Sequence, residues 1–244
     1  MPTLAVDTSG EVCILALGRD RQPISERRFY HKMNLLRRIL PNIEGMLSDA
    51  GYVPADLDAV VVALGPGSFT GLRIGVTIAK SLAYGLSKPI VGIGTLDALA
   101  RTAAPRAAEL ICPMIHARAN EVYWTLTDSS GTQRLTDYRI GSVQEALQDL
   151  SQRDCAVYFC GTGASRNAEA IRNTLGGRAV VGEPWLEHAT GAALLELGLR
   201  RIEQADFDDA LSLTPLYVRK PTPLVRLESG ELSPGGPKHG GRSE

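Results

Sequence analysis

The chain has 244 residues, a formal net charge of -1 and 44% hydrophobic residues, which suits one large globular domain or two small ones. Strong nucleic-acid binders usually carry a basic excess, so this charge balance disfavours a protein that grips RNA or DNA by itself. No apolar run approaches membrane-spanning length and no signal segment opens the sequence, so we expect a cytoplasmic protein without membrane contact.

The residue types that commonly bind metals are scattered along the chain. The cysteines lack the Cys-x-x-Cys spacing of zinc and redox sites, and the histidines lack a partner at helical spacing. We therefore expect buried free thiols and no metal centre. These residues are Cys13, Cys112, Cys155, Cys160, His31, His116, His188 and His239.

The first thirty residues predict an antiparallel meander of three strands, between Thr3 and Phe29. At the end of the first strand, Asp7, Thr8 and Ser9 supply a carboxylate and two hydroxyl groups. Such groups can hold a metal-bound phosphate, or they can simply build the turn to the second strand. We favour the turn, because no second acidic motif lies nearby in the sequence.

An amphipathic helix is predicted over residues 35–50, because apolar side chains recur there at helical spacing and Gly51 follows its end. Its apolar positions include Leu36, Ile39 and Ile43. Pro41 lies inside the pattern and marks either a kink or the first turn.

The most informative stretch is a strand, a loop and a helix. Ala59–Leu64 is a short β-branched run, which predicts a strand covered on both faces. The loop GPGSFTG contains Gly65 and Gly67, and Ser68 or Thr70 can cap the next helix. The loop either offers its amide groups to an anion or only makes the turn, and the residues leave both interpretations open. Its spacing matches neither the dinucleotide fingerprint nor the P-loop.

The helix predicted at residues 70–86 carries a stripe of small residues four apart, namely Gly71, Gly75, Ala79 and Ala83. Small side chains let another helix or a sheet approach closely. Further apolar residues surround the stripe, which indicates contact on two sides. A partner protein and the rest of the same domain are equally compatible with that pattern. A strand at residues 88–93 and a short helix capped by Thr95 complete the first half.

From residue 109 the order of elements begins again, and a strand once more ends in a glycine pair, Gly161 and Gly163. The repetition predicts two structural repeats that face each other. A helix at residues 190–204 could return to the first half, and the composition of residues 228–244 is typical of disorder. The other elements predicted here are strands at 110–115, 121–128, 133–138, 156–160 and 178–181, and helices at 143–150 and 164–175.

Five short segments carry a family resemblance. They are Asp7–Ser9, His31–Pro41, Leu64–Arg73, Ala117–Tyr123 and Pro215–Arg219. Together they resemble the bacterial TsaB (YeaZ) family over residues 3–220, and the LGPGSFTGLR segment is highly specific for it. The resemblance implies an α/β fold of the actin, sugar-kinase and Hsp70 class, with two ribonuclease-H-like halves whose mixed sheets are flanked by helices. The implied division is 1–104, 105–220 and a tail at 221–244.

The resemblance also implies a function. Members of this family help to attach a threonylcarbamoyl group to the adenosine beside the anticodon of tRNA. They look non-catalytic: a TsaD-like paralogue carries the metal and transfers the group from threonylcarbamoyl-AMP, and a TsaE-like ATPase joins them. The chain would pair with that paralogue, or with itself as a homodimer, and would reach tRNA only through the complex. No tightly bound cofactor is implied, although ATP or ADP at a subunit joint is left open.

Two sets of site residues follow, and neither contains a catalytic residue or a metal ligand. The partner-binding set lies on the two predicted helices of the first half and comprises Leu36, Ile39, Ile43, Gly71, Arg73, Gly75, Thr77, Ala79, Lys80 and Tyr84. The nucleotide-binding or anion-binding set comprises Asp7, Thr8, Ser9, Gly65, Gly67, Gly161 and Gly163.

Three departures from the family patterns bear on the alternatives. The catalytic paralogue has a second histidine four residues after the first, whereas here Leu35 follows His31. His116 stands where the family usually has aspartate, and no serine follows His31. One alternative function is a nucleotide-dependent ATPase or phosphotransferase that uses Asp7 and the glycine loops. The other is a glycoprotease-type peptidase, which a single histidine disfavours because one imidazole makes a poor metal site.

Overall fold

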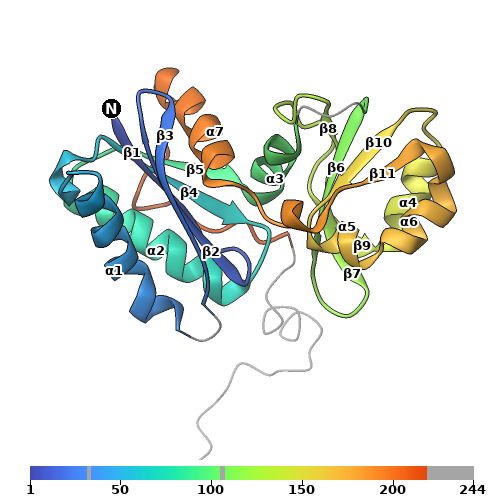
Figure 1. The fold of residues 1–244 in the computed structure, drawn as a ribbon, viewed down its shortest axis with the longest axis horizontal. Coiled ribbons are helices and arrows are strands. Elements are labelled where there is room, and N and C mark those ends of the chain that lie inside the picture. Colours follow the sequence, from blue (N-terminus) through green and yellow to red (C-terminus); the bar gives the residue numbers. More distant parts are fainter. Residues whose placement is uncertain (32–33, 105–107, 219–244) are drawn as a thin grey trace, which may run out of the picture.

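The computed structural model describes residues 1–31, 34–104 and 108–218. Two β-sheets lie side by side, each with helices against it, and helix α3 (Thr95–Ala103) lies between them (Figure 1). The predicted tail at residues 221–244 falls outside the described residues, as do Lys32, Met33 and Arg219 of the motif segments.

The first sheet has the strand order β3-β2-β1-β4-β5. Strands β1, β2 and β3 pair antiparallel, which confirms the predicted meander, whereas β4 is parallel to β1 and β5 is parallel to β4. The bounds are β1 Pro2–Asp7, β2 Val12–Arg19, β3 Gln22–Tyr30, β4 Ala59–Gly65 and β5 Ile90–Gly94.

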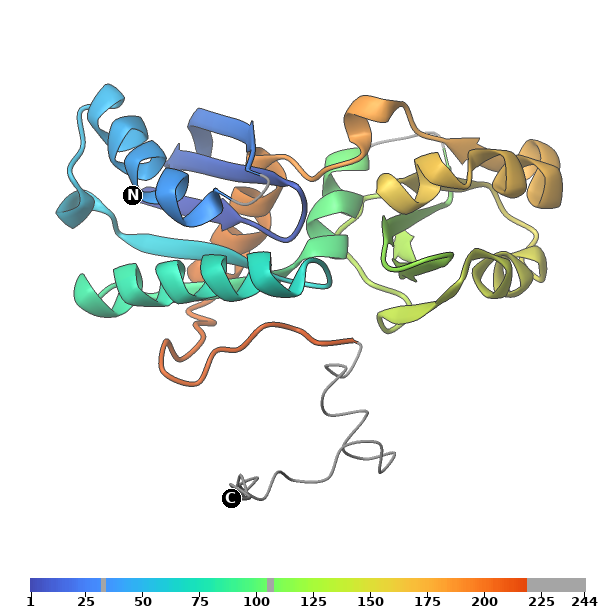
Figure 2. The same cartoon turned by 90° about the horizontal axis from the view of Figure 1, so that it is seen from below.

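Helices cover both faces of this sheet, so strand β4 is buried over its whole length, as predicted. Because side chains alternate along a strand, Val60 and Val62 face helix α2 (Phe69–Gly85), while Val61 faces helix α7 (Gly191–Glu203). Helix α1 (Leu35–Asp49) lies on the same face as α2, with Pro41 inside it. Figure 2 shows α1 and α2 on one side of the sheet and α7 behind it.

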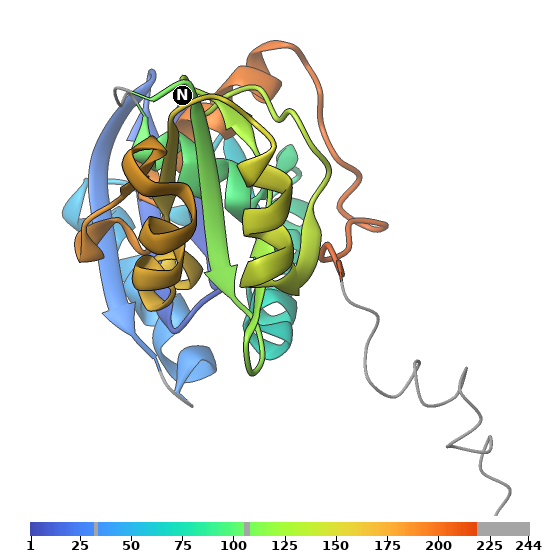
Figure 3. The same cartoon turned by 90° about the vertical axis from the view of Figure 1, so that its right-hand side faces the viewer.

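The second sheet repeats this plan, with the order β11-β10-β6-β7-β9 and a short strand β8 beside β6. Helices α4 and α6 cover its outer face (Figure 3). The matching strand order confirms the two structural repeats and the predicted fold class. The bounds are β6 Leu110–His116, β7 Glu121–Trp124, β8 Thr127–Asp128, β9 Arg139–Ser142, α4 Val143–Ser151, β10 Val157–Cys160, α5 Thr162–Arg166, α6 Ala168–Leu175 and β11 Ala179–Val181.

Three predicted elements of the second half were wrong in detail. The strand expected at 121–128 is broken between β7 and β8, where Thr125 Oγ1 donates to Thr136 O. The residues expected as a strand at 133–138 follow an irregular path, because Thr136 bonds through its side chain as well. The helix expected at 164–175 is divided at Asn167, whose Nδ2 donates to Gly163 O (2.8 Å).

The end of the described chain returns to the first half. Helix α7 packs on the first sheet, and the segment after it, residues 206–218, runs along β5 and α2 (Figure 2). We call this segment the C-terminal strap. It is held where Asp208 accepts from Gly92 N, where Lys80 Nζ donates to Leu211 O and Leu213 O, and where Leu216 N donates to Leu64 O. The predicted division at residue 105 assigned these residues to the second half, whereas they pack on the first.

Helix α3 connects the halves. Ala98 packs against the core of the first sheet, while Leu99 and Ala103 pack against the second sheet. Arg101 pairs with Glu196 of α7 (2.8 Å), which ties the two crossing helices together. The N-cap of α3 is Gly94.

Candidate ligand cavity and docking face

A cavity of about 880 Å³ lies between the two halves. The first half contributes the turn after β1, the loop before α2, and α3; the second half contributes the turn after β6 and the start of α5. The strap closes one side with Leu216, Tyr217 and Val218. The cavity is therefore lined by residues from most of the motifs that the sequence analysis identified.

Asp7 is the most buried acid on the cavity wall, with 4% of its surface exposed. Burial raises the pKa of this carboxyl group above its ordinary value, and hydrogen bonds from Ser9 and the nearby charges of His188 and Arg28 offset part of that rise. Its Oδ1 accepts from Ser9 N (2.8 Å). These bonds show that Asp7 and Ser9 build the turn between β1 and β2, the interpretation that the sequence favoured.

The first glycine loop, residues 65–71, packs closely against that turn. A Cβ atom at Gly67 would overlap Ser9 O, and Ser68 N donates to the same oxygen (2.6 Å). Ser68 Oγ accepts from Gly71 N (3.2 Å) and so caps α2, as predicted. Gly65 has a φ of +110° and lies against Leu72. Close backbone approach explains these glycines without a ligand.

The second glycine loop is equally closed. A Cβ atom at Gly161 would overlap Met114 O of strand β6, and one at Gly163 would lie 3.0 Å from the carbonyl carbon of the same residue. Neither glycine lines the cavity, and neither do Thr8 and Gly65. Of the predicted anion-binding set, Asp7, Ser9 and Gly67 remain on the cavity wall.

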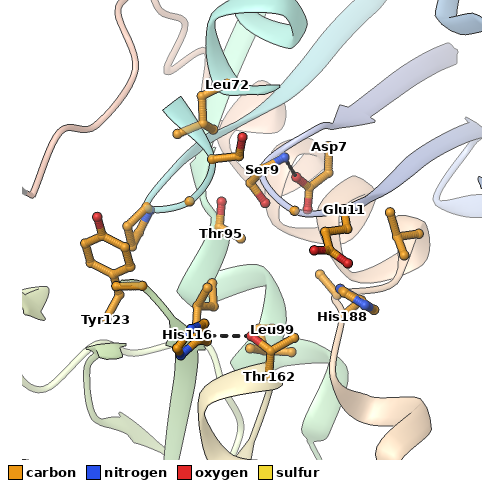
Figure 4. Close-up of a pocket in the computed structure, with 18 of the residues that line it drawn as sticks. Asp7, Ser9, Glu11, Leu72, Thr95, Leu99, His116, Tyr123, Thr162 and His188 are labelled. Atoms are coloured by element: carbon orange, nitrogen blue, oxygen red, sulfur yellow. Dashed lines mark hydrogen bonds between the residues drawn. The ribbon is translucent and has the colours of Figure 1, made fainter. Parts of the chain in front are cut away.

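The sequence analysis missed several residues of the cavity wall. Figure 4 shows Asp7, Glu11 and His188 on one side, with Tyr123 and His116 across from them. Burial lowers the pKa of His188, and burial together with Arg166 lowers that of His116. Thr95, Arg118 and Arg166 also line the cavity. The repeated order of elements could have indicated one of these residues. The end of β6 corresponds to the end of β1, so His116 occupies the position of Asp7.

The predicted partner-binding set divides into buried and exposed residues, and the buried ones require a correction. Ile39, Ile43, Gly71, Gly75 and Ala79 are all inside the first half. A Cβ atom at Gly75 would overlap Thr8 Oγ1, which itself donates to Gly71 O (2.8 Å). The stripe of small residues is therefore the surface through which α2 packs on its own sheet, and it cannot contact a partner in this fold.

The exposed members of the set lie on the solvent side of α1 and α2. Leu36 is 66% exposed and Tyr84 is 69% exposed. Arg73 and Thr77 are also exposed, and Leu40 of α1 joins them. We call Leu36, Leu40, Arg73, Thr77 and Tyr84 the docking face. Lys80 is half-buried and held by the strap, so it lies outside this face.

The strap also fixes the cavity end of α2. The guanidinium of Arg73 stacks on the Phe69 ring (3.9 Å to the centroid), and its Nε donates to Tyr217 Oη (3.2 Å). The rings of Phe69 and Tyr217 are 5.3 Å apart. One side chain, Arg73, thus belongs both to the docking face and to the wall of the cavity.

Within the described residues, no group of three or more histidine, cysteine, aspartate or glutamate side chains is arranged to hold a metal ion. The same part of the chain contains no helix that is long and apolar enough to cross a membrane.

Comparison with known proteins identifies the family to which the chain belongs. A protein of Bacillus subtilis named tRNA threonylcarbamoyladenosine biosynthesis protein TsaB is 33% identical, over 90% of this chain and 94% of that protein. The chain belongs to the TsaB family. The TsaB protein of Haemophilus influenzae is 30% identical over 93% of this chain and 98% of its own length. A family model described as TsaD, tRNA N6-adenosine threonylcarbamoyltransferase, matches residues 31–201.

Solved structures support the TsaB assignment. A Pseudomonas aeruginosa protein described as similar to peptidase YeaZ superposes with a TM-score of 0.77 at 25% identity, over 89% of this chain and 99% of that one. YeaZ from the same organism gives a TM-score of 0.73 at 25% identity, over 88% and 99% of the two chains. The family resemblance drawn from the five sequence segments is confirmed.

Proposed function

We propose that this chain acts in the biosynthesis of tRNA threonylcarbamoyladenosine as a non-catalytic accessory subunit. Its role is to bind and position a TsaD-like catalytic paralogue in the cytoplasm, with a TsaE-like ATPase as the third component and tRNA reached through the complex. One observation carries the proposal: the relationship to TsaB proteins spans nearly the whole length of both chains.

The docking face is the surface that we assign to the paralogue. Leu36, Leu40 and Tyr84 expose apolar surface on two helices of the same sheet face, and such groups contribute much of the binding energy of protein interfaces. Arg73 adds a planar cation at the edge. In the absence of the paralogue, the same face would pair two copies of this chain as a homodimer.

The region around His31 supports an accessory role. His31 Nε2 lies 2.9 Å from Gly10 O, and the residue is buried. Leu35, at the position of the second histidine of the catalytic paralogue, is buried in the core beneath α1. A hydrophobic side chain at that position supports the proposal that the metal chemistry belongs to the partner.

Reconstitution tests the proposal. We would combine the TsaD-like and TsaE-like proteins, threonylcarbamoyl-AMP, ATP and unmodified tRNA, with and without this chain, and quantify modified adenosine by mass spectrometry of digested tRNA. We expect product only when the chain is present, and none from the chain alone. An equal yield without it would refute the proposal.

A further inference from the structure

Arg73 is an exposed side chain of the docking face that two aromatic residues hold in place. Its guanidinium lies on the Phe69 ring, 3.9 Å from the centroid, and its Nε donates to Tyr217 Oη (3.2 Å). The Phe69 and Tyr217 rings also contact each other, with centroids 5.3 Å apart. A long surface side chain normally samples many rotamers, and ordering it on binding costs free energy. In this chain the fold has already ordered Arg73.

The arrangement leaves one edge of this guanidinium for a partner. The ring of Phe69 covers a face of the group and the bond to Tyr217 uses Nε, so among the described residues the two Nη groups keep their donors. Two neighbouring N–H groups of an arginine form a fork that matches the two oxygens of a carboxylate or a phosphate. The fixed fork of Arg73 is therefore prepared for an anionic group outside the described chain.

The second half shows what a stacked arginine does when an acid is within reach. Its two arginines that stack on aromatic rings each pair with a carboxylate, Arg134 with Asp97 (3.6 Å) and Arg139 with Asp149 (3.3 Å). Stacking uses the face of the guanidinium and leaves its edge to the acid. Arg73 has the same stacked arrangement, but no carboxyl group of the described residues pairs with it.

The hydroxyl group of Tyr217 is not what holds the strap on the first half. The strap is anchored by the bonds of Asp208, Lys80 and Leu216 described above. The hydroxyl takes part in none of these bonds, and it accepts from Arg73 Nε. Loss of the hydroxyl should therefore leave the strap in place and release the Arg73 side chain alone.

We propose that Tyr217 is a positioning residue for the docking face, where it holds the Arg73 guanidinium in place for a carboxylate of the TsaD-like paralogue. The inference rests on the proposed function, which supplies this partner. A protein carboxylate fits better than a tRNA phosphate, because Leu36, Leu40 and Tyr84 give the docking face exposed apolar surface. Apolar anchors with an arginine are typical of protein interfaces, whereas surfaces that bind nucleic acid are more polar and more positively charged.

The positioning of Arg73 can be tested on the full chain without a partner. The NMR signal of the Arg73 Nε–H group, assigned by its absence in Arg73→Gln, reports the hydrogen bond through its exchange with water. We expect Tyr217→Phe to speed this exchange several-fold, while the urea midpoint stays at the parent value. Tyr52→Phe, which removes the acceptor of Arg19 Nη1, is the matched control and should leave the Arg73 signal unchanged. Parent-like exchange in Tyr217→Phe would overturn the inference.

A double-mutant cycle, measured by calorimetry with the TsaD-like paralogue, tests the role in binding. Arg73→Gln should weaken binding roughly tenfold and Tyr217→Phe roughly threefold, but Tyr217→Phe should cause no further loss in the Arg73→Gln background. Arg139→Gln, at an exposed stacked arginine of the second half, should bind like the parent. Equal losses in both backgrounds, or no loss in either, would contradict a positioning role. If the parent itself does not bind, the proposed function fails as well.

Carboxyl footprinting of the saturated complex identifies the group that Arg73 contacts. A carbodiimide with glycine ethyl ester labels accessible aspartate and glutamate side chains, and mass spectrometry locates the label. We expect one carboxyl group of the paralogue to be labelled several-fold more in the complex with Arg73→Gln than in the complex with the parent. The absence of such a group would overturn the assignment of a carboxylate. Weaker tRNA binding by the Arg73→Gln complex with unchanged paralogue affinity would also overturn it, in favour of a phosphate.

Discussion

The first strand of each half ends on a wall of the same cavity, β1 at Asp7 and β6 at His116. Burial raises the pKa of the acid and lowers that of the imidazole, so both groups are shifted toward their neutral forms. Asp7 accepts from Ser9 N in its turn, whereas His116 N donates to Thr162 Oγ1 and Arg166 helps to lower the pKa of the His116 imidazole. The same position in the repeat thus carries an acid in one half and an imidazole in the other, and both side chains line the cavity.

The glycine loops extend this comparison. The loop after β4 leads into α2, a helix of 17 residues that Ser68 caps and the strap holds. The loop after β10 leads into α5, which has five residues and ends at Asn167. The long helix carries Arg73, Thr77 and Tyr84 of the docking face, whereas the short one brings Thr162 and Arg166 to the cavity wall. The two loops therefore differ in the length of the helix that follows them, and not in their glycines.

The largest expected effect concerns the small residues through which α2 packs on its sheet. Gly75→Leu forces a side chain into Thr8, and we expect the free energy of unfolding to fall by about 3 kcal/mol or more. Urea denaturation followed by circular dichroism measures this change. Gly85→Ala is the control, since nothing lies within 4 Å of a Cβ atom there. Equal stability of the two variants would break the assignment of the stripe to internal packing.

A second prediction addresses the docking face. The double variant Leu36→Glu with Tyr84→Glu should weaken binding of the TsaD-like paralogue by roughly 2 kcal/mol, about thirtyfold, because two apolar anchors are lost. Binding would be measured by calorimetry and folding by circular dichroism. Leu135→Glu, an exposed leucine of the second half, should bind like the parent. If the double variant binds normally, this face is not the contact.

A third prediction concerns pH. The native pKa of Asp7 is raised above 3.8, so the native state loses stability as the pH rises through that raised value and the buried carboxyl ionises. Asp7→Asn removes this loss and keeps an oxygen that can accept from Ser9 N. We therefore expect the variant to have a higher urea midpoint than the parent at neutral pH, and the same midpoint below pH 3.8. Asp154→Asn, at an exposed site on the second half, is the control variant. A constant difference across this range would contradict the assigned cause.

Much of the fold follows from local patterns. The β-branched run at Ala59–Leu64 indicated a strand covered on both faces, because its length and its flanking glycine and proline excluded a helix. The repeated order of elements then indicated two similar halves. The irregular path at residues 133–138 was not predictable, because the side chain of Thr136 replaces ladder bonds that a sequence pattern cannot reveal.

The candidate site was harder to predict, for a geometric reason. An apolar stripe on α2 shows that this side of the helix is covered. The helical spacing of its residues does not say whether a sheet of the same chain or a partner protein covers it. Gly75 is explained by Thr8, which lies far earlier in the sequence, and Ala79 packs with Val60 and Val62 of the strand before the helix. Arg166 and Thr95 belong to different halves and meet only through the fold. No local motif distinguishes them.

The positions of α3 and α7 have a consequence for folding. Each follows the last parallel strand of its own repeat, yet α7 packs on the first sheet and α3 packs on both sheets. Neither repeat therefore has a complete core by itself, and a fragment that ends at residue 104 would leave Ala5, Ala16 and Val61 uncovered. We therefore expect the two repeats to unfold in a single transition rather than one after the other.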